Sequence, residues 1–500
     1  MLKGLPIASL LVSQVKLLPR RVAVLSSGIA RRSGAATLCT TLQTKYDPRG
    51  NERTFRAPRH PMTTLARTLG LRDLILLIIG SVIGSGIFLV PGAILRQVEG
   101  SVGLALLVWL GGGVLSLLGA LTYGELAAMN PAAGGLYVYI RDCFGRLPAF
   151  LYGWTLFLVI ASGSVATLAV AFSTYLGEVV RMPPLVAKIV SVAMIAVVTA
   201  VNALSTRQSA DLQNWTTLIK VGAVLAMSAV LFLLGQSYSD IAPALWPAHA
   251  DRSLLSNCGV AMIAVLWAYE GWQFASYSAG EALDPQRDFP RAFLAGTVFL
   301  IAIYLLANAA YLVALGPTDT AQSNAIAASS VARVLNPAAA KGVALTILIS
   351  VFSGANSIQL TAPRVFYAMA ADGLFFRRLA EVHPRFRTPA IAVLAGGVWS
   401  ALLAWTGTFQ QLFTYVIFAG WIFYGLAAAS IFVYRRRSPD AIRPYRVPGY
   451  PWTPLLFVAA SAALVINTIA AAPRGAAVGI GIVLLGLPAY LIWRPRARSA

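Results

Sequence analysis

A run of glycines and serines interrupts a hydrophobic stretch between Gly80 and Phe88. If this stretch crosses a membrane, a helix broken there leaves backbone N–H groups unpaired, which a bilayer tolerates only where they line a cavity or bind a ligand. Free amides at the start of a half-helix attract anions. The run therefore predicts a binding site for a small carboxylate-bearing solute. The candidate site residues in this run are Ile83, Gly84, Ser85, Gly86 and Ile87.

A second hydrophobic stretch carries a polar interruption that begins at Trp267. The candidate site residues there are Trp267, Tyr269, Glu270, Gly271 and Trp272. Two broken helices five helices apart predict an inverted repeat, with the substrate bound between the two breaks. The alternatives are that the glycines of the first run only form a small-residue packing face, and that the aromatic side chains are interface anchors or packing residues.

Lys220 is the lysine that the sequence places inside a hydrophobic stretch. The other lysines after Met62, which are Lys188 and Lys341, lie at the outer ends of predicted helices. An ionisable group within a span costs at least ~2.5 kcal/mol and therefore indicates a function. Burial disfavours the charged ammonium, so the same amine is able to cycle a proton. The alternative is that the side chain snorkels to a helix end about two turns away.

Glu270 is the carboxylate that we place deepest in a span, next to the predicted pocket. An unpaired charge at this depth is expensive. Three roles remain open: the side chain binds a cationic substrate, carries a proton, or only caps a half-helix. The first role favours a broad or cationic specificity.

The composition explains why these residues must sit in membrane helices. Hydrophobic residues make up 58% of the chain, charged residues only 11%, and the mean hydropathy is +0.72. Such values are typical of a polytopic membrane protein. Twelve apolar runs are near the ~20 residues that a spanning helix needs. They cover residues 72–95, 101–123, 147–175, 186–204, 213–235, 257–280, 292–316, 341–368, 388–406, 410–434, 452–472 and 475–493.

The arginines predict the orientation of these helices. Most arginines after Met62 fall in the connections on one side, for example in the run Arg435-Arg436-Arg437. The positive-inside rule then places both termini in the cytoplasm. The formal charge of +21 is explained by topology and by lipid headgroups, and it does not indicate nucleic-acid binding.

The chain divides into three predicted regions. Residues 1–61 form a basic extension that is either an organelle targeting segment, a disordered tail, or upstream sequence from a mis-called start before Met62. Residues 62–434 form the transport core of helices 1–10. Residues 435–500 add helices 11 and 12 and a short basic tail.

Cysteine and histidine are sparse. Cys39, Cys143 and Cys258 have no paired spacing, and the three histidines lie outside the spans. The sequence therefore predicts no metal site, no cofactor and no structural disulfide. It also lacks an intramembrane nucleophile–base pair, so we expect no enzyme.

Several motifs in order resemble the amino acid–polyamine–organocation (APC) superfamily of amino acid permeases, closest to its L-type amino acid transporter branch. They are Ile83–Phe88, Tyr123-Gly124-Glu125-Leu126, Ala133–Tyr137, Tyr269–Trp272, Glu281 with Asp284-Pro285, Ser353–Ser357, Pro363–Tyr367 and His383–Pro389. The resemblance implies an all-α fold of twelve transmembrane helices with a 5+5 inverted-repeat, LeuT-like core and broken helices 1 and 6.

The resemblance also implies roles for residues. The substrate carboxylate would meet the amides of Ser85, Gly86 and Ile87, and its amino group would meet the carbonyls of Ile83 and of the Trp267–Glu270 turn. Tyr269 and Trp272 would be gate or pocket walls. Lys220 would replace the sodium ion of sodium-coupled relatives between helices 1 and 8, and it would form the coupling site with Ser353 and Asn356 of helix 8.

The expected function is secondary active transport of amino acids across the cell membrane by alternating access, by exchange or by proton coupling. The alternatives are a polyamine or amine transporter and an amino acid sensor that does not transport. Mammalian L-type transporters join a heavy chain through a cysteine between helices 3 and 4. The loop around Gly177 to Pro184 has none, so no disulfide-linked heavy chain is expected.

Overall fold

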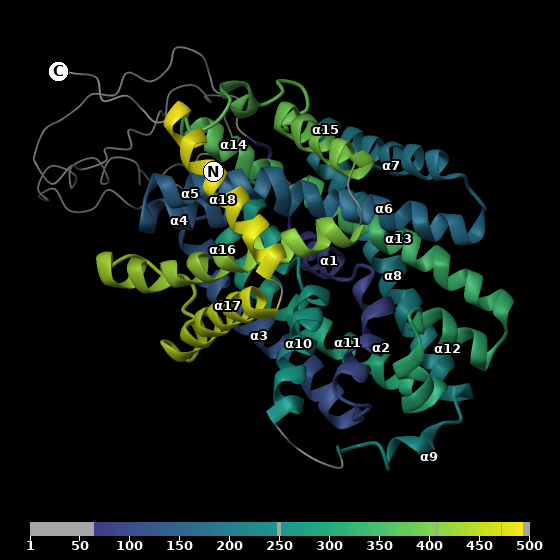
Figure 1. Ribbon diagram of the computed structural model, residues 1–500. Coiled ribbons are helices and arrows are strands. Elements are labelled where there is room, and N and C mark those ends of the chain that lie inside the picture. Colours follow the sequence, from purple (N-terminus) through teal and green to yellow (C-terminus); the bar gives the residue numbers. More distant parts are fainter. Residues whose placement is uncertain (1–64, 248–251, 407–408, 472, 494–500) are drawn as a thin grey trace, which may run out of the picture. The chain divides into compact units, whose positions relative to one another are not determined.

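The computed structural model describes residues 65–247, 252–406, 409–471 and 473–493. The predicted extension 1–61 and the last arginines of the chain lie outside these ranges. Within them the regular structure is helical and includes no named strand; the backbone pairs once in a strand-like way, between Leu69 and Ala282. Figure 1 shows the order of the helices.

The first hydrophobic stretch forms two helices instead of one. Helix α1 (Leu71–Val82) and helix α2 (Gly86–Gln97) are bent by 47° at the residues between them. The break falls within the predicted glycine and serine run. The second interruption likewise ends helix α10 (Arg252–Ala268), and a 3₁₀ segment, η2 (Trp272–Glu281), follows.

Long apolar helices account for most of the other elements. They are α3 (Val102–Met129), α5 (Arg146–Thr155), the π turn η1 (Leu156–Ile160), α6 (Ala161–Val179), α7 (Pro184–Leu204), α8 (Thr206–Leu234), α11 (Pro285–Gln322), α13 (Pro337–Thr361), α15 (Ala390–Thr406), α16 (Phe409–Arg437), α17 (Trp452–Ala471) and α18 (Pro473–Trp493). Short elements connect them: α4 (Leu136–Phe144), α9 (Tyr238–Ile241), α12 (Ile326–Val334), α14 (Pro363–Ala371) and the 3₁₀ turn η3 (Arg377–Ala380).

Local sequence sets several helix starts. Proline occupies the first turn of α7, α11 and α13, where its missing N–H costs nothing. The Ser205 hydroxyl accepts a hydrogen bond from the Gln208 N–H at 3.2 Å and so begins α8. This start fixes the helix that carries Lys220.

The described residues contain eight helices long and apolar enough to cross a membrane, or nine if the bent α1–α2 pair is one span. Three of the twelve predicted runs are not among them: 257–280, where α10 stops at the break, 388–406, where α15 is only 17 residues long, and 410–434, which lies in α16. The chain is a membrane protein with several spans. Twelve spans and the inverted repeat stay predictions.

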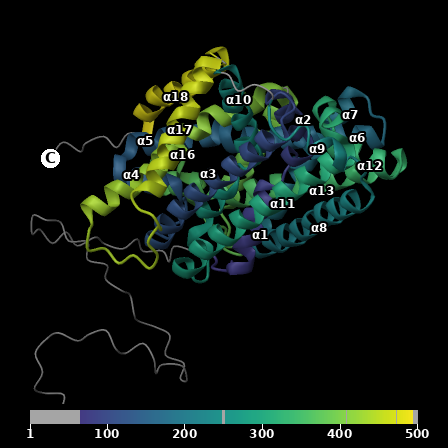
Figure 2. The same ribbon diagram turned by 90° about the horizontal axis from the view of Figure 1, so that it is seen from below.

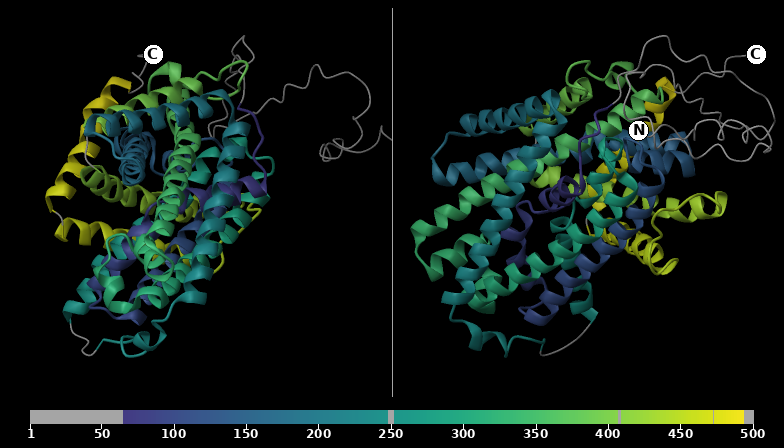
Figure 3. Two further views of the ribbon diagram at one scale, coloured as in Figure 1. Left: turned by 90° about the vertical axis from the view of Figure 1, so that its right-hand side faces the viewer. Right: turned by 180° about the vertical axis from the view of Figure 1, so that it is seen from behind.

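Helix α1 lies at the centre of the packing. It contacts α8, α11 and α13, and Figures 1 and 2 show α1 beside α8. The right-hand view of Figure 3 shows the mid-chain helices, in teal and green, running alongside one another. A Cβ added to Gly80 would lie 2.2 Å from the Gln213 side chain, so this glycine does serve close packing.

Candidate functional site

The break in helix 1 exposes the last carbonyl groups of α1, and Lys220 binds them. Its Nζ atom donates hydrogen bonds to the oxygens of Gly80 at 2.6 Å and Ile83 at 2.7 Å, and the side chain is completely buried. A cation is favoured at the carboxyl end of a helix. Lys220 therefore points to the break and does not snorkel.

Ser350 of α13 binds the same break. Its hydroxyl lies 2.9 Å from the Ile83 oxygen and 3.1 Å from the Gly84 oxygen. With Lys220 already bound, both lone pairs of the Ile83 carbonyl have a donor. Sequence reasoning missed Ser350. The available signal was its spacing, because Ser350 lies one helical turn before Ser353 on the same apolar helix.

Ser353 and Asn356 both bind Gln213 of α8. Gln213 Nε2 donates to the Ser353 hydroxyl at 3.2 Å, and Gln213 Oε1 accepts from Asn356 Nδ2 at 3.0 Å. Asn202 of α7 donates to Asn356 Oδ1 at 2.9 Å. The three predicted coupling residues are all buried; Lys220 binds α1, whereas Ser353 and Asn356 join α13 to α8.

The second break lies directly against the first. Gly271 has a φ of 128°, and an added Cβ would lie 2.7 Å from the Ser81 carbonyl oxygen. Ser81 donates its hydroxyl to the Gly271 oxygen at 3.0 Å. The hydroxyl of Tyr304 lies 3.0 Å from the oxygens of both Val82 and Ala268, so one donor is shared between the two breaks. Only glycine suits position 271.

A cavity of about 70 Å³ lies between the breaks. The predicted site residues that line it are Gly84, Ser85, Gly86, Trp267 and Glu270. The Ser85 hydroxyl is buried and has no hydrogen-bond partner among the described residues. The amino end of α2 and the carboxyl end of α10 therefore meet at one small cavity.

Glu270 presents one free oxygen at this cavity. Its Oε1 atom accepts a hydrogen bond from the Tyr424 hydroxyl at 2.8 Å, whereas Oε2 is buried and has no partner within the described ranges. A buried carboxylate oxygen without a hydrogen bond costs free energy, so Oε2 is available to accept a hydrogen bond from a ligand. Sequence reasoning missed Tyr424, because a tyrosine in a span is usually a packing residue.

Tyr269 and Trp272 face away from this cavity. The Tyr269 ring packs on Tyr304, with centroids 4.9 Å apart, and on Trp109. The Trp272 ring packs on Tyr123, with centroids 5.1 Å apart. Neither residue lines the cavity. The helical period is lost at the break, so the direction of these rings did not follow from the sequence.

A buried ion pair lies between this site and the end of the helices where α1 begins. Arg364 Nε lies 2.6 Å from Glu281 Oε2, and Arg364 Nη2 lies 2.9 Å from Glu281 Oε1. Arg364 Nη2 also donates to the Thr206 hydroxyl at 3.0 Å. Both charged side chains are fully buried. The pair joins η2, α8 and α14.

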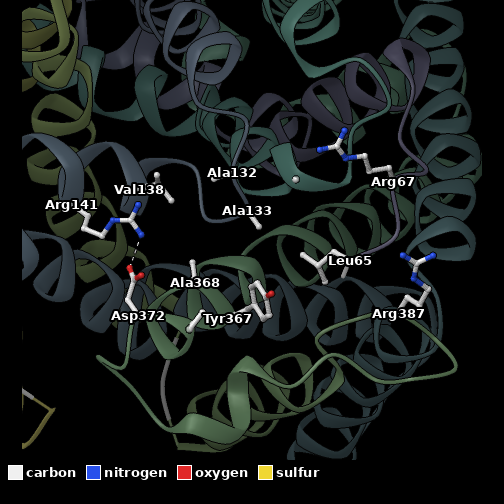
Figure 4. Close-up of a pocket in the computed structure, with 12 residues that line it drawn as sticks. Leu65, Arg67, Ala132, Ala133, Val138, Arg141, Tyr367, Ala368, Asp372 and Arg387 are labelled. Atoms are coloured by element: carbon white, nitrogen blue, oxygen red, sulfur yellow. Dashed lines mark hydrogen bonds and ion pairs between the residues drawn. The ribbon is translucent and has the colours of Figure 1, made fainter. Parts of the chain in front are cut away.

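A larger cavity of about 710 Å³ opens at the same end (Figure 4). Ala133, Ala368, Tyr367 and Arg67 are among its lining residues, and Figure 4 shows the ion pair between Arg141 and Asp372 at one side, 2.6 Å apart. Burial, together with the Asp372 carboxylate, raises the pKa of the Tyr137 hydroxyl, which donates to Asp372 at 2.8 Å.

Further ion pairs tie the same end together. Glu125 of α3 lies 2.6 Å from Arg435 of α16, and Asp73 of α1 lies 2.8 Å from Arg207 of α8. Cys143 and Cys258 are free, and Cys39 lies outside the described residues. In the part of the chain that the structure describes, no group of three or more His, Cys, Asp or Glu side chains is placed to hold a metal ion.

Comparison with known proteins gives a family match over most of the chain. The amino acid permease family model matches residues 69–492. The b(0,+)-type amino acid transporter 1 of Mus musculus is 32% identical over 431 residues, which cover 85% of this chain and 87% of that protein.

Two further relatives are similar. The serine/threonine exchanger SteT of Bacillus subtilis (strain 168) is 30% identical over 438 residues, covering 87% of this chain and 98% of that protein. The cystine/glutamate transporter of Homo sapiens is 31% identical over 454 residues, covering 88% of each. The resemblance predicted from the motifs is confirmed. This chain belongs to the amino acid permease family.

Proposed function

We propose that this protein is a secondary active transporter of amino acids across the cell membrane. It works by alternating access, either as an exchanger or as a proton-coupled permease. Its three relatives named above are amino acid transporters or exchangers by their names. We propose twelve spanning helices with both termini in the cytoplasm, and an inverted-repeat core of residues 62–434 to which residues 435–500 are peripheral.

One observation carries this proposal: the amino end of α2 faces the carboxyl end of α10 across a small cavity that both Ser85 and Glu270 line. The first amides of a helix have no intrahelical acceptor, so the N–H groups at Ser85, Gly86 and Ile87 suit a carboxylate. The unpartnered Ser85 hydroxyl is a further donor at the same point. An α-carboxylate is the group that such a site selects.

The α-amino group needs acceptors on the other side of the cavity. The Ile83 carbonyl has two donors already, from Lys220 and Ser350. We therefore propose that the amino group binds the carbonyls of the turn from Trp267 to Glu270. Trp267 forms a wall of the pocket, while Tyr269 and Trp272 hold the broken helix in place by packing.

Glu270 Oε2 is the acceptor left for the substrate side chain. A cationic side chain would form a charge-assisted hydrogen bond there, which is stronger than a neutral one. We propose a broad or cationic amino acid specificity. The b(0,+)-type transporter is among the relatives at 32% identity.

Lys220 takes the place of a coupling cation in this proposal. It joins α1 to α8, and Ser350 adds α13, so the amine holds the broken helix against two neighbours. Release toward the cytoplasm requires η2 to move away from α14. The Glu281–Arg364 pair must separate for that motion, and the cavity in Figure 4 is then the exit.

An amine transporter and a sensor are the alternatives. An amine lacks the carboxylate that the α2 amides suit, and a sensor would bind an amino acid without moving it. We propose no enzyme activity and no nucleic-acid partner. We also propose no disulfide-linked heavy chain, because the loop between α6 and α7 has no cysteine.

Uptake of labelled amino acids into proteoliposomes tests the proposal. Uptake that needs internal amino acid identifies an exchanger, and uptake driven by an imposed pH gradient without internal substrate identifies a proton-coupled permease. If binding of amino acids is measured but no uptake occurs, the protein is a sensor. If only polyamines or other amines move, the carboxylate site is refuted.

A further inference from the structure

A surface cavity of about 860 Å³ lies apart from the transport site, at the end of the helices that we propose to be cytoplasmic. It is formed by the first residue of α5, the segment before and within η3, and the last residues of α18. Its lining includes Arg146, Arg377, Arg378, Phe376, Ile492 and Trp493. Neither Glu270 nor any residue of the helix 1 break contributes to it.

The cavity is positively charged. The guanidinium groups of Arg146, Arg377 and Arg378 are exposed, and among the described residues none of them has a hydrogen-bond or ion-pair partner. Asp372 also lines the cavity, but Arg141 binds its carboxylate at 2.6 Å and Tyr137 at 2.8 Å. Three free cations therefore face one acid that is already neutralised.

The cavity also has an apolar wall that is exposed. Phe376 is 57% exposed and Ile492 is 76% exposed. The Trp493 ring lies 5.1 Å from the Phe376 ring and 5.5 Å from the Phe375 ring, measured between centroids. A tryptophan at the end of a spanning helix, as Trp493 is in α18, is typical of the depth of the lipid headgroups. Leu491, on the same last turn of α18, is 65% exposed.

We propose that this cavity binds the headgroup of an anionic phospholipid. The arginines would bind the phosphate, for which a planar guanidinium is well suited. The acyl chains would lie along the exposed apolar residues of α18. A soluble phosphate compound would use only the basic wall, whereas a lipid uses both walls. The sequence continues with Arg494, Arg496 and Arg498, which lie outside the described residues. This inference needs only the membrane location, not the transport activity.

The test compares phosphatidylglycerol with phosphatidylcholine of the same acyl chains, bound to the purified full-length protein and counted by native mass spectrometry. The double variant Arg377→Gln/Arg378→Gln removes two of the three cations. The double variant Arg436→Gln/Arg446→Gln is the matched control, because both of these arginines are exposed and lie outside the cavity. Inorganic phosphate is the probe for a soluble anion.

The proposal predicts preferential binding of phosphatidylglycerol by the native chain. Arg377 and Arg378 line the cavity and would bind the phosphate directly, so we expect a loss of affinity on the order of tenfold in the cavity variant. The control arginines lie outside the cavity, so the control should keep the affinity of the native chain. Phe376→Ala should weaken lipid binding by a few fold without touching a cation.

Three results would overturn the lipid site: equal binding of the two lipids by the native chain, equal loss in the two double variants, or competition by millimolar inorganic phosphate. The comparison of lipids on the native chain does not depend on any variant folding. Amino acid uptake is scored separately, so a transporter without this lipid site would be recognised.

Discussion

Lys220 and Glu270 are two ionisable residues beside the helix breaks, and the structure treats them in opposite ways. The Lys220 amine donates to two backbone carbonyls of α1 and does not line the cavity. Glu270 lines the cavity, and only one of its two oxygens has a partner. The first residue is satisfied by the fold, and the second is left half-satisfied.

This difference assigns the two residues to different tasks. A cation bound to two carbonyls of α1 holds the broken helix in position, so its loss should affect every substrate alike. An unpaired acceptor at the cavity is available to a ligand, so its loss should affect substrates differently. An equal loss of uptake for all substrates therefore indicates the first task, and a change in the ratio between substrates indicates the second.

The largest effect is expected from Lys220→Ala. The substitution removes the Lys220 donor from the Gly80 oxygen and one of two side-chain donors from the Ile83 oxygen, and a buried group left unsatisfied costs about 1–3 kcal/mol. We expect uptake of cationic and neutral amino acids to fall equally, on the order of 100-fold, with a lower unfolding temperature. Lys341→Ala, at an exposed lysine, is the control and should match the native chain. If the variant keeps most of the uptake, Lys220 does not hold the broken helix in position.

Gly271→Ala tests the close contact between the two breaks, at the residue after Glu270. The added Cβ would meet the Ser81 oxygen at 2.7 Å, at a φ of 128° that other residues avoid. Strain of this kind costs about 1–3 kcal/mol. The matched control is Gly222→Ala in α8, where nothing lies within 4 Å of the added atom. Unfolding temperatures in detergent should fall for the first variant and not for the second. Equal stability of the two variants would contradict the close contact of the breaks.

Tyr424→Phe removes only the hydroxyl that binds Glu270. A hydrogen bond to a charged group contributes about 1.5–3 kcal/mol, although the cavity is able to supply a replacement donor. We expect the KM for a cationic amino acid to change by about fivefold and that for a neutral one to stay within about twofold. Tyr490→Phe serves as the control. A uniform change in both KM values would argue against a positioning role.

Ser350→Ala should give the smallest effect. The Ile83 carbonyl keeps Lys220 when the serine hydroxyl is lost. A typical intramolecular hydrogen bond contributes about 0.5–1.5 kcal/mol, so uptake of all substrates should fall by only a few fold. Combining it with Lys220→Ala should give more than the sum of the two losses, because only the double variant removes both side-chain donors from the Ile83 oxygen. Strict additivity would show that they act independently.

The sequence was most informative at residues whose types are unusual in a membrane helix. Glycine and serine in an apolar run located the break, and a lysine and a glutamate at membrane depth located the two ionisable groups. These are local signals, since each residue is unusual whatever its neighbours are.

Partners from distant helices could not be read in the same way. Tyr424, Tyr304 and Ser350 reach the breaks only because α16, α11 and α13 pack against them, and a hydroxyl in an apolar helix usually bonds its own backbone. The direction of Tyr269 and Trp272 was equally hidden, because helical periodicity ends at Ala268. The family relationship was predictable because it rests on the order of many motifs.

The most direct test of the account is the ratio of labelled arginine uptake to labelled leucine uptake in proteoliposomes, measured for the native chain and for Glu270→Gln. Glu99→Gln, at an exposed acid, is the control. The account predicts that Glu270→Gln lowers the ratio by about tenfold, because a charge-assisted contact is lost, and that uptake of leucine persists. An unchanged ratio, or an equal loss of both amino acids, would show that Glu270 does not face the substrate.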